Sequence, residues 1–239
     1  MNIAIQLYTL RDSYKNKDEF KAVLRKVKEL GYAGVEFAGY AGFGAEELKL
    51  FLKEIDLVPL SSHHPIEKLD TDLESILDFD AKVGCRYVVC SYAPTSTKEE
   101  LIYLKQVMER AKTAIKSYPM ELAYHNHIHE FKPLQDGTIP MEEIRKVCML
   151  EVDTYWAFQA HTEPCFYLMD NAKDIALVHI KDGDFNENPL ALGEGNNNIK
   201  GILEASKEIG MGWIIVENDF PKPDGLSDIA RSIGYLTSR

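Results

Sequence analysis

Positive charge is scarce in this sequence of 239 residues, which carries 27 Lys and Arg against 38 Asp and Glu, for a formal net charge of −11. Basic patches supply most of the free energy with which proteins bind nucleic acid or anionic lipid surfaces. The acidic balance therefore argues against nucleic acid and membrane as partners, and we expect a small-molecule ligand instead.

Long apolar runs are missing as well. No stretch approaches the roughly 18 apolar residues of a membrane-spanning helix, and the first residues carry no basic segment and no apolar run of signal-peptide length. We therefore expect a cytoplasmic protein. The four cysteines form no Cys-x-x-Cys pair and lie mostly in apolar segments, so we expect reduced core thiols rather than disulfides or a zinc–thiolate site.

Short apolar runs alternate with longer segments of helical periodicity along the chain, which is the pattern of a parallel sheet wrapped by helices. Each run is brief and rich in Val, Ile or Leu. The expected strands are residues 3–7, 33–37, 58–62, 86–91, 120–126, 148–153, 175–180 and 213–217. Eight such units within roughly 200 to 250 residues are typical of one TIM barrel. The sequence thus predicts the α/β class and a single (β/α)8-barrel domain over residues 1–239.

Residue spacing in the intervening segments supports helices. The first of them places four apolar residues on one face, namely Phe20, Val23, Leu24 and Val27. A later helix begins with Thr97–Glu100, which has the form of a capping box. Two stretches, 132–140 and 183–198, are loosely composed. We expect these to be long loops rather than domain boundaries.

The residues at the carboxyl ends of the expected strands are unusually polar, and this is where a parallel barrel gathers its functional groups. They are Gln6, Glu36, His63, His64, Ser91, His125, His127, Asp153, His179, Lys181 and Glu217. Neighbouring carboxylates repel one another unless one is protonated or a cation lies among them. We therefore expect one divalent metal ion. Imidazole and carboxylate ligands leave Mn²⁺, Zn²⁺, Co²⁺, Fe²⁺ and Mg²⁺ open.

Seven segments, in order along nearly the whole chain, resemble the sugar phosphate isomerase/epimerase family, the xylose isomerase-like TIM barrels. They are Gln6–Asp12, Gly31–Phe37, Tyr124–Phe131, Asp153–Trp156, His179–Asp182, Leu192–Gly195 and Ile215–Asp219. The resemblance implies a metal held by an acidic residue on strand 5, an aspartate on strand 6, a histidine on strand 7 and a glutamate on strand 8.

Carried over to this chain, the last three ligands are Asp153, His179 and Glu217. The strand 5 position departs from the family, because the best-aligned residue is His125 where ketose epimerases have a glutamate; Glu130 is the alternative ligand. After strand 7, Lys181 stands where those epimerases carry a substrate-binding arginine. Both departures argue against simple ketose 3-epimerisation by two metal-bound glutamates.

Three further residues are candidates for catalysis. His127 and Glu130 can act as acid, base or substrate clamp, or can support their neighbours. His127 should point the same way as His125, because side chains alternate along a strand. Lys181 can stabilise an oxyanion or bind a phosphate, or it can be a surface lysine.

Three more residues are candidates for substrate binding. Glu36 and His63 can bind sugar hydroxyls or belong to a solvated polar rim. Trp156 can form a stacking wall for a sugar or be a buried core residue. Each of these alternatives stays open at the level of sequence.

The predicted function is that of a metal-dependent isomerase or epimerase acting on a sugar, keto-sugar or sugar phosphate through a metal-bound enediolate. Glu217 is the first choice for the base. Two alternatives remain: an inosose-dehydratase-like or keto-sugar lyase activity at the same site, and a sugar-binding barrel without catalysis. Whether the chain forms a homo-oligomer is left open.

Overall fold

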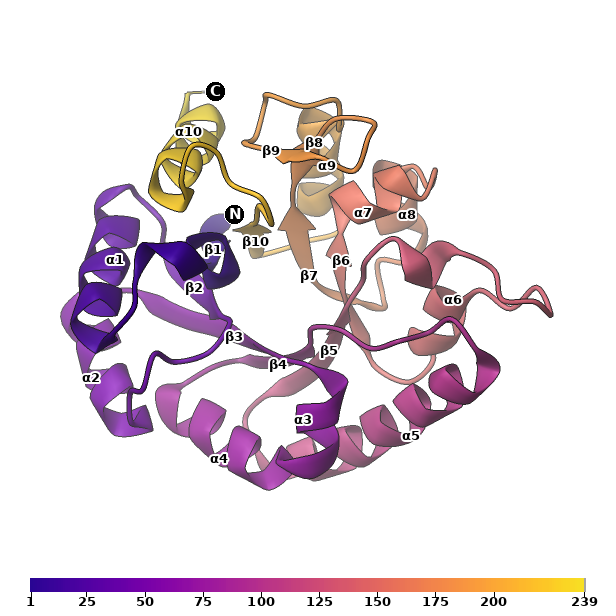
Figure 1. The fold of residues 1–239 in the computed structure, drawn as a ribbon. Coiled ribbons are helices and arrows are strands. Elements are labelled where there is room, and N and C mark those ends of the chain that lie inside the picture. The colour runs from indigo at the N-terminus through magenta and orange to yellow at the C-terminus, as the bar shows by residue number, and fades with distance from the viewer. Residues whose placement is uncertain (239) are drawn as a thin grey trace.

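The computed structural model describes residues 1–238, and eight parallel strands close into a barrel within them. The strand order is β1-β10-β7-β6-β5-β4-β3-β2, so the first and last strands of the barrel lie side by side (Figure 1). The barrel strands are β1 (Asn2–Gln6), β2 (Gly34–Phe37), β3 (Val58–His64), β4 (Tyr87–Cys90), β5 (Glu121–His125), β6 (Met149–Asp153), β7 (Ile175–Ile180) and β10 (Trp213–Val216). The predicted single-domain TIM barrel is confirmed.

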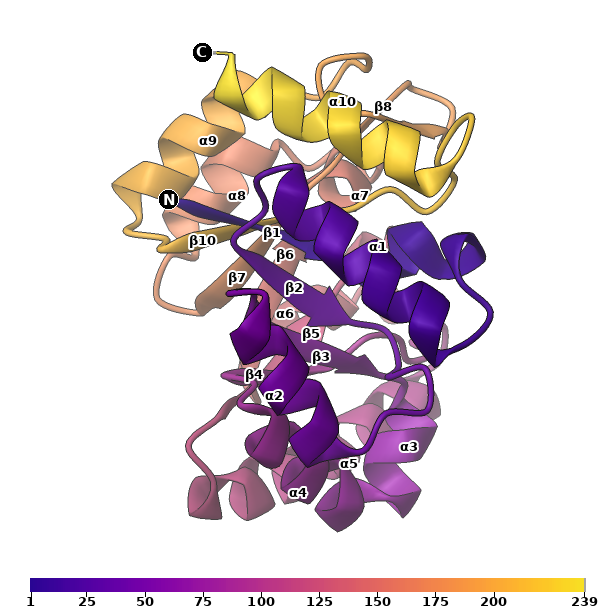
Figure 2. The same ribbon diagram turned by 90° about the vertical axis from the view of Figure 1, so that its left-hand side faces the viewer.

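Helices surround this barrel, and Figure 2 shows α1 and α2 on its outer face. The α-helices are α1 (Lys17–Glu29), α2 (Ala45–Glu54), α3 (Ile66–Thr71), α4 (Leu73–Val83), α5 (Lys98–Ala114), α6 (Pro140–Ile144), α7 (Thr154–Gln159), α8 (Pro164–Asp170), α9 (Ile199–Glu208) and α10 (Gly225–Thr237). Three 3-10 helices are η1 (Leu7–Ser13), η2 (Ile115–Ser117) and η3 (His129–Phe131). No helix within residues 1–238 combines the length and apolar character needed to cross a membrane.

The local predictions are confirmed where the sequence signal is strong. All eight strands lie within two residues of their predicted ends, the four apolar residues of α1 are buried, and Thr97 forms a capping box with Glu100 at the start of α5. The stretch 183–198 is more ordered than expected. It contains part of a small antiparallel pair, β8 (Asp182–Gly183) with β9 (Pro189–Leu190). The buried Asp182 carboxylate accepts hydrogen bonds from the backbone N–H groups of Gly193 and Gly195.

The barrel interior is filled by one apolar layer, which consists of Ala4, Leu60, Val89, Ala123, Leu177 and Ile215. Side chains alternate along a strand, so the residue two positions further on points to the same side, one step nearer the carboxyl end. For Ala123, Leu177 and Ile215 those residues are His125, His179 and Glu217. Strand geometry therefore places polar groups directly above the apolar layer.

At the amino end of the barrel, the partly buried Trp213 ring packs against the apolar layer. A Cβ atom on Gly34 would lie 2.8 Å from that ring and 3.0 Å from the Val58 carbonyl oxygen. Only glycine leaves room at this point. With that end packed, access to the interior polar groups is from the carboxyl end, where the cavity described below opens.

Candidate metal centre and cavity

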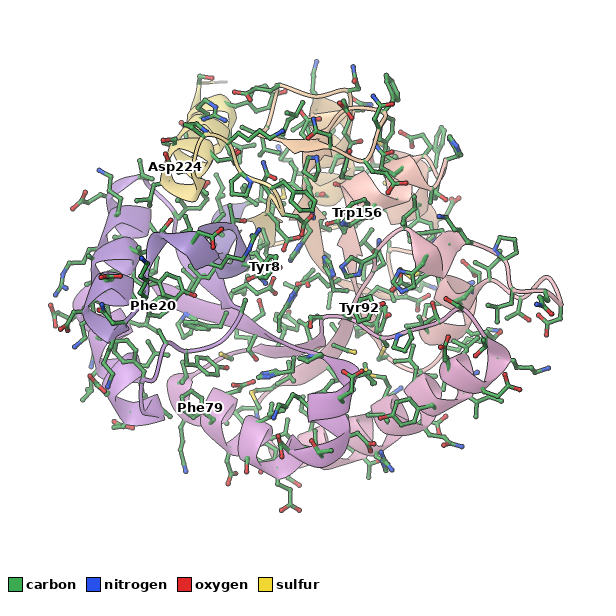
Figure 3. The ribbon with its side chains drawn as sticks, in the orientation of Figure 1. Tyr8, Phe20, Phe79, Tyr92, Trp156 and Asp224 are labelled. Carbon is green, nitrogen blue, oxygen red and sulfur yellow. The ribbon has the colours of Figure 1, made fainter. Side chains whose placement is uncertain are left out.

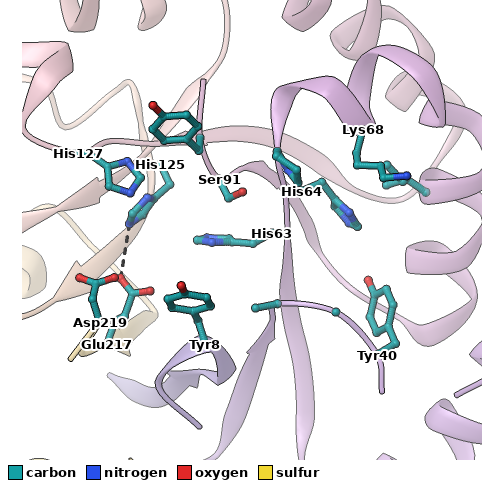
Figure 4. Close-up of a pocket in the computed structure, with 15 residues that line it drawn as sticks. Tyr8, Tyr40, His63, His64, Lys68, Ser91, His125, His127, Glu217 and Asp219 are labelled. Atoms are coloured by element: carbon teal, nitrogen blue, oxygen red, sulfur yellow. Dashed lines mark ion pairs between the residues drawn. The ribbon is translucent and has the colours of Figure 1, made fainter. Parts of the chain in front are cut away.

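Four side chains meet above the apolar layer, and we call them the upper cluster: His125 from β5, Asp153 from β6, His179 from β7 and Glu217 directly after β10. All four are buried, and one potential ligand atom from each lies within 4.8 Å of the others. Figure 4 shows His125 and Glu217 facing each other across this part of the barrel mouth. The structure thus brings together the four residues that the sequence nominated as metal ligands.

The spacing around His125 in the upper cluster fits metal ligands better than hydrogen bonds, whereas His179 is within hydrogen-bond distance of Glu217. His125 Nε2 lies 3.5 Å from Asp153 Oδ2 and 3.7 Å from Glu217 Oε2, and His179 Nδ1 lies 3.1 Å from Glu217 Oε2. Tetrahedral ligands with bonds of about 2.1 Å are separated by about 3.4 Å. Neither ring nitrogen of the buried His125 has a hydrogen-bond partner in the described part of the chain. A divalent ion bound to His125 Nε2 would give that nitrogen a partner.

The charges of this region also fit a divalent cation. Lys181 is fully buried, not a surface lysine, and its Nζ lies 3.0 Å from Glu217, 3.2 Å from Asp153 and in contact with Asp219. The Lys181 ammonium thus faces three carboxylates. Burial alone raises the pKa of Glu217, but Lys181 and His179 outweigh it and hold that pKa well below its usual range. The carboxylate is therefore ionised, as a metal ligand must be.

A second group lies deeper in the barrel, and we call it the lower cluster: Glu36, His63, Glu151 and His179. Its members hydrogen-bond to one another, with His63 Nε2 at 2.6 Å from Glu151 and His179 Nε2 at 2.7 Å from Glu36. Gln6 and Ser61 donate further hydrogen bonds to Glu36. His179 belongs to both clusters. Its Nε2 is held from below by Glu36 and its Nδ1 faces Glu217 above, which is the carboxylate–histidine arrangement that orients metal ligands.

The lower cluster changes the placement of two sequence candidates. Glu36 is fully buried and lies deeper than the polar rim on which we expected it. His63 lines the cavity, but its ring also stacks on His179 with centroids 5.5 Å apart. Burial lowers the pKa of His63, yet Glu36 and Glu151 raise it more, to about 10. His63 is therefore a cation between two carboxylates at neutral pH.

His127 and Glu130 lie beside the upper cluster. His127 lines the cavity with its ring 5.0 Å from that of His125, and both rings face the same region, as the strand parity predicted. Burial, reinforced by nearby His125 and Lys181, lowers the pKa of His127 to about 2, so it is neutral. Glu130 accepts hydrogen bonds from the Tyr124 hydroxyl and the His127 backbone N–H. It lies with His127 and His129 rather than in the upper cluster.

Trp156 is largely buried at the start of α7. Its ring lies 5.2 Å from Lys181 Nζ and 6.3 Å from the ring of His127. The indole is thus part of the wall behind Lys181. Figure 3 shows Trp156 between the helices and the barrel mouth.

A cavity of about 670 Å³ opens above the upper cluster at the carboxyl ends of the strands. His125, His127, Glu217 and Asp219 line one end of it. Two half-exposed aromatic rings, Tyr8 and Tyr92, line it nearer to solvent. Pockets of roughly 300 to 1,000 Å³ hold small organic ligands. The cavity is therefore large enough to place a polyol against His125 and Glu217, the two potential ligands that line it.

Sequence reasoning missed several of these residues. Glu151 and Asp219 each stand two positions from a nominated residue, Asp153 and Glu217, and share its face of the strand or its extension. That spacing was the available signal. The buried Asp80 of α4 was missed too, although it interrupts an otherwise apolar helix face.

Comparison with known proteins adds one family match. The model of the family described as xylose isomerase-like TIM barrel matches residues 24–238. No curated protein matches this sequence. A solved sugar phosphate isomerase/epimerase from Parabacteroides distasonis superposes with a TM-score of 0.86 at 23% identity, covering 100% of this chain and 98% of its own.

Two other solved structures share the fold. The IolI protein, whose crystal structure holds a zinc atom, has a TM-score of 0.80 at 17% identity, with 100% of this chain and 97% of that chain covered. An L-ribulose 3-epimerase has a TM-score of 0.77 at 15% identity, with 99% and 93% covered. At these identities the likeness establishes the architecture, and the chemistry has to be argued from the site.

Proposed function

Because the chain belongs to the xylose isomerase-like TIM-barrel family, we propose that it is a divalent-metal-dependent isomerase or epimerase acting on a sugar, keto-sugar or sugar phosphate. The observation that carries this proposal is the geometry of the upper cluster. Two buried carboxylates and two imidazoles converge there at ligand spacing, and the His125 nitrogens lack any other partner within residues 1–238. His125, rather than Glu130, is the proposed strand 5 ligand.

A divalent ion bound by these residues would polarise a substrate carbonyl and make the adjacent C–H bond acidic. Mn²⁺, Zn²⁺, Co²⁺ and Mg²⁺ are the candidate ions. The zinc in the IolI structure is a reason to test Zn²⁺ early, beside Mn²⁺. Lys181, His63 and Glu36 fix the ligand side chains from behind and below.

Proton transfer is assigned to residues beside the metal ligands. Glu217 lines the cavity, is ionised, and is the proposed base that takes the proton and leaves an enediolate. Neutral His127 faces the same space and is proposed to exchange the second proton. Glu130 holds the His127 backbone and positions it. Lys181 is fully buried behind the cavity wall, so in this proposal its ammonium acts on substrate only through the carboxylates of Asp153, Glu217 and Asp219.

The proposed substrate contact is made by His63 at the cavity wall, whereas Trp156, the other candidate, packs behind the buried Lys181. Glu36 acts on substrate only through His63 and His179 in this proposal, because it has no exposed surface. A cytoplasmic location and the oligomeric state stay predictions.

A second candidate is dehydration or lyase chemistry on a keto-sugar at the same site. One observation favours it: His125 occupies the strand 5 position, so the upper cluster contains a single glutamate. A two-glutamate relay is then missing, whereas loss of a β-hydroxyl or β-alkoxy group needs one base and one acid. Glu217, which is ionised and lines the cavity, can serve as that base.

The test combines metal content with solvent exchange. Elemental analysis of purified protein is expected to find about one divalent ion per chain. NMR in D₂O with Mn²⁺ or Zn²⁺ and a panel of ketoses, inososes and keto-glycosides should show deuterium at the activated carbon. Glu217→Gln should abolish that exchange, and Glu54→Gln, on the exposed face of α2, should leave it unchanged. Exchange without metal dependence would contradict the proposal.

Two further outcomes assign the reaction class. Loss of water or of an alcohol alongside exchange would favour the lyase. Absence of metal uptake, of any metal-dependent thermal shift and of exchange would leave a sugar-binding barrel without catalysis.

A further inference from the structure

The cavity extends well beyond the proposed metal site. Figure 4 shows Glu217, Asp219 and His125 at one end and Tyr40, His64 and Lys68 at the other, with His63 between them. We call the second end the distal end and define it by Tyr40, His64, Pro65, Lys68 and Ile76. These residues come from the loop after β2, from the end of β3 and from α3 and α4. Neither the metal ligands nor the proposed proton-transfer residues lie there.

The distal end is held in place by a buried carboxylate. Asp80 of α4 is fully buried and accepts hydrogen bonds from the Tyr40 hydroxyl and the Ser62 hydroxyl, and it lies 3.0 Å from His64 Nε2. A buried carboxylate is costly unless its hydrogen bonds are satisfied. Here three side chains from two other segments satisfy it, and two of them, Tyr40 and His64, line the cavity. The wall is therefore preorganised.

This wall offers an apolar surface with one polar position. The Tyr40 ring packs against Phe37 and Phe79, with centroids 5.2 Å and 4.4 Å away, so its orientation is fixed. Pro65 and Ile76 add apolar surface beside it. The second ring nitrogen of His64 makes no hydrogen bond within residues 1–238. A planar or chair-shaped ring with a hydroxyl or ether oxygen matches such a surface.

We infer that the distal end is a subsite for a second ring joined to the reacting sugar, so that the substrate is a glycoside rather than a free monosaccharide. This rests on the proposed function, which places the reacting sugar at the upper cluster. A cavity of about 670 Å³ lies in the middle of the range that holds drug-sized ligands, and a single sugar ring is much smaller than these. A second ring would fill the remaining space and make the contacts that Tyr40 and Ile76 present.

A phosphate group fits the distal end less well. Its two basic side chains already have carboxylate partners, since Lys68 pairs with Asp72 at 2.8 Å and His64 lies 3.0 Å from Asp80. The Lys68 side chain is also 62% exposed. Phosphate sites usually offer arginine forks or several backbone N–H groups. The chemistry of the wall therefore favours an uncharged ring.

Paired ligands test this inference on the Mn²⁺-loaded protein. Isothermal titration calorimetry would compare the methyl and phenyl β-glycosides of glucose, galactose and xylose, together with glucose 6-phosphate and galactose 6-phosphate. We expect at least one phenyl glycoside to bind about tenfold more tightly than its methyl partner, as expected for burial of an aromatic ring. Saturation-transfer NMR should show the phenyl protons in contact with protein.

Substitutions test whether the tighter binding of the phenyl glycoside comes from the distal end. Ile76→Asn should reduce the phenyl advantage to less than about twofold and leave methyl glycoside binding unchanged. Leu50→Asn, an exposed apolar position on α2, should keep the full advantage. If Ile76→Asn melts below the assay temperature, His64→Ala replaces it and should lower the advantage about threefold by removing imidazole surface that the phenyl ring would cover. Lys68→Glu should not change it.

Three results would overturn the subsite. The first is that no phenyl glycoside binds more tightly than its methyl partner, and the second is that the advantage survives both Ile76→Asn and His64→Ala. The third is tighter binding of a sugar phosphate that Lys68→Glu abolishes, which would make the distal end an anion site. Metal uptake and deuterium exchange test the proposed function separately, so failure of one inference is distinguishable from failure of the other.

Discussion

The upper and lower clusters contain the same kinds of residue, two carboxylates and two imidazoles, yet they differ in how those groups are satisfied. In the lower cluster, His63 and His179 lie 2.6 to 3.2 Å from Glu36 and Glu151, which is hydrogen-bond distance. In the upper cluster, His125 lies 3.5 and 3.7 Å from its carboxylates and has no hydrogen bond to any described residue.

The two clusters have the same composition, so their different geometry is what gives them different roles, one as a support and the other as a proposed binding site. Groups that already satisfy one another form a support, because a ligand would have to break their hydrogen bonds. A group such as His125, which meets carboxylates but leaves its own ring nitrogens without a hydrogen bond, indicates a binding site for a cation. His179 joins the two, and through it the lower cluster fixes the orientation of the upper one.

The largest effect should come from breaking both clusters at their shared residue. His179→Gln removes the Nδ1 ligand and the partner of Glu36 at once. We expect metal content to fall from about one ion per chain to below a tenth, and turnover to fall roughly 10³-fold, since a metal supplies several kcal/mol of transition-state stabilisation. Elemental analysis and initial rates measure both. The control is His161→Gln, at an exposed position. If the His179→Gln protein retained its metal, His179 would not be a metal ligand.

A matched pair of glutamates should separate the clusters. Glu217→Gln removes a ligand of the upper cluster and should abolish turnover and weaken Mn²⁺ binding by about 10²-fold or more. Glu151→Gln changes the lower cluster alone and should weaken binding by about tenfold, the usual effect of a residue that orients a ligand. Calorimetric titration with Mn²⁺ measures the two affinities. Equal effects would contradict the division into site and support.

Lys181→Met tests whether the upper cluster depends on positive charge for its stability. The substitution removes the ammonium that Asp153, Glu217 and Asp219 share, and breaking a buried ion pair costs roughly 3 to 5 kcal/mol of stability. We therefore expect a lower melting temperature without metal and a larger metal-induced rise than in the parent protein. Thermal melts with and without Mn²⁺ test this, with exposed Lys200→Met as control. An unchanged metal-induced shift would show that Lys181 and the ion do not share these carboxylates.

The smallest effect is a pH dependence from the lower cluster. Folding raises the pKa of His63 from 6.5 to about 10, because Glu36 and Glu151 outweigh the opposing effect of burial. The stability that this provides is fully present below pH 6.5 and is lost as the pH rises through 10, by a few kcal/mol at most. Urea unfolding of metal-free protein between pH 6 and 10 measures the slope. Glu151→Gln should flatten it, and an unchanged slope would exclude His63 as its source.

Much of the fold was predictable because its signals are local. Apolar runs of strand length, the apolar face of α1 and the Thr97 capping box each depend on residues close in sequence. The proposed metal ligands Asp153, His179 and Glu217 were nominated with the help of a family resemblance, and strand parity explains why they share a side of the barrel with His125. The preference for His125 over Glu130 needed coordinates, because both follow the same strand within a few residues.

By itself, the sequence determined which residues stand at the carboxyl ends of eight strands, because hydrophobic runs and alternation set the strands and their facing sides. Tertiary structure decided which of those residues satisfy one another. The pairing of His63 with Glu151, the burial of Lys181 among carboxylates and the link from Asp80 to Tyr40 join segments far apart in the chain. Such contacts depend on the closure and stagger of the barrel, which no local pattern encodes.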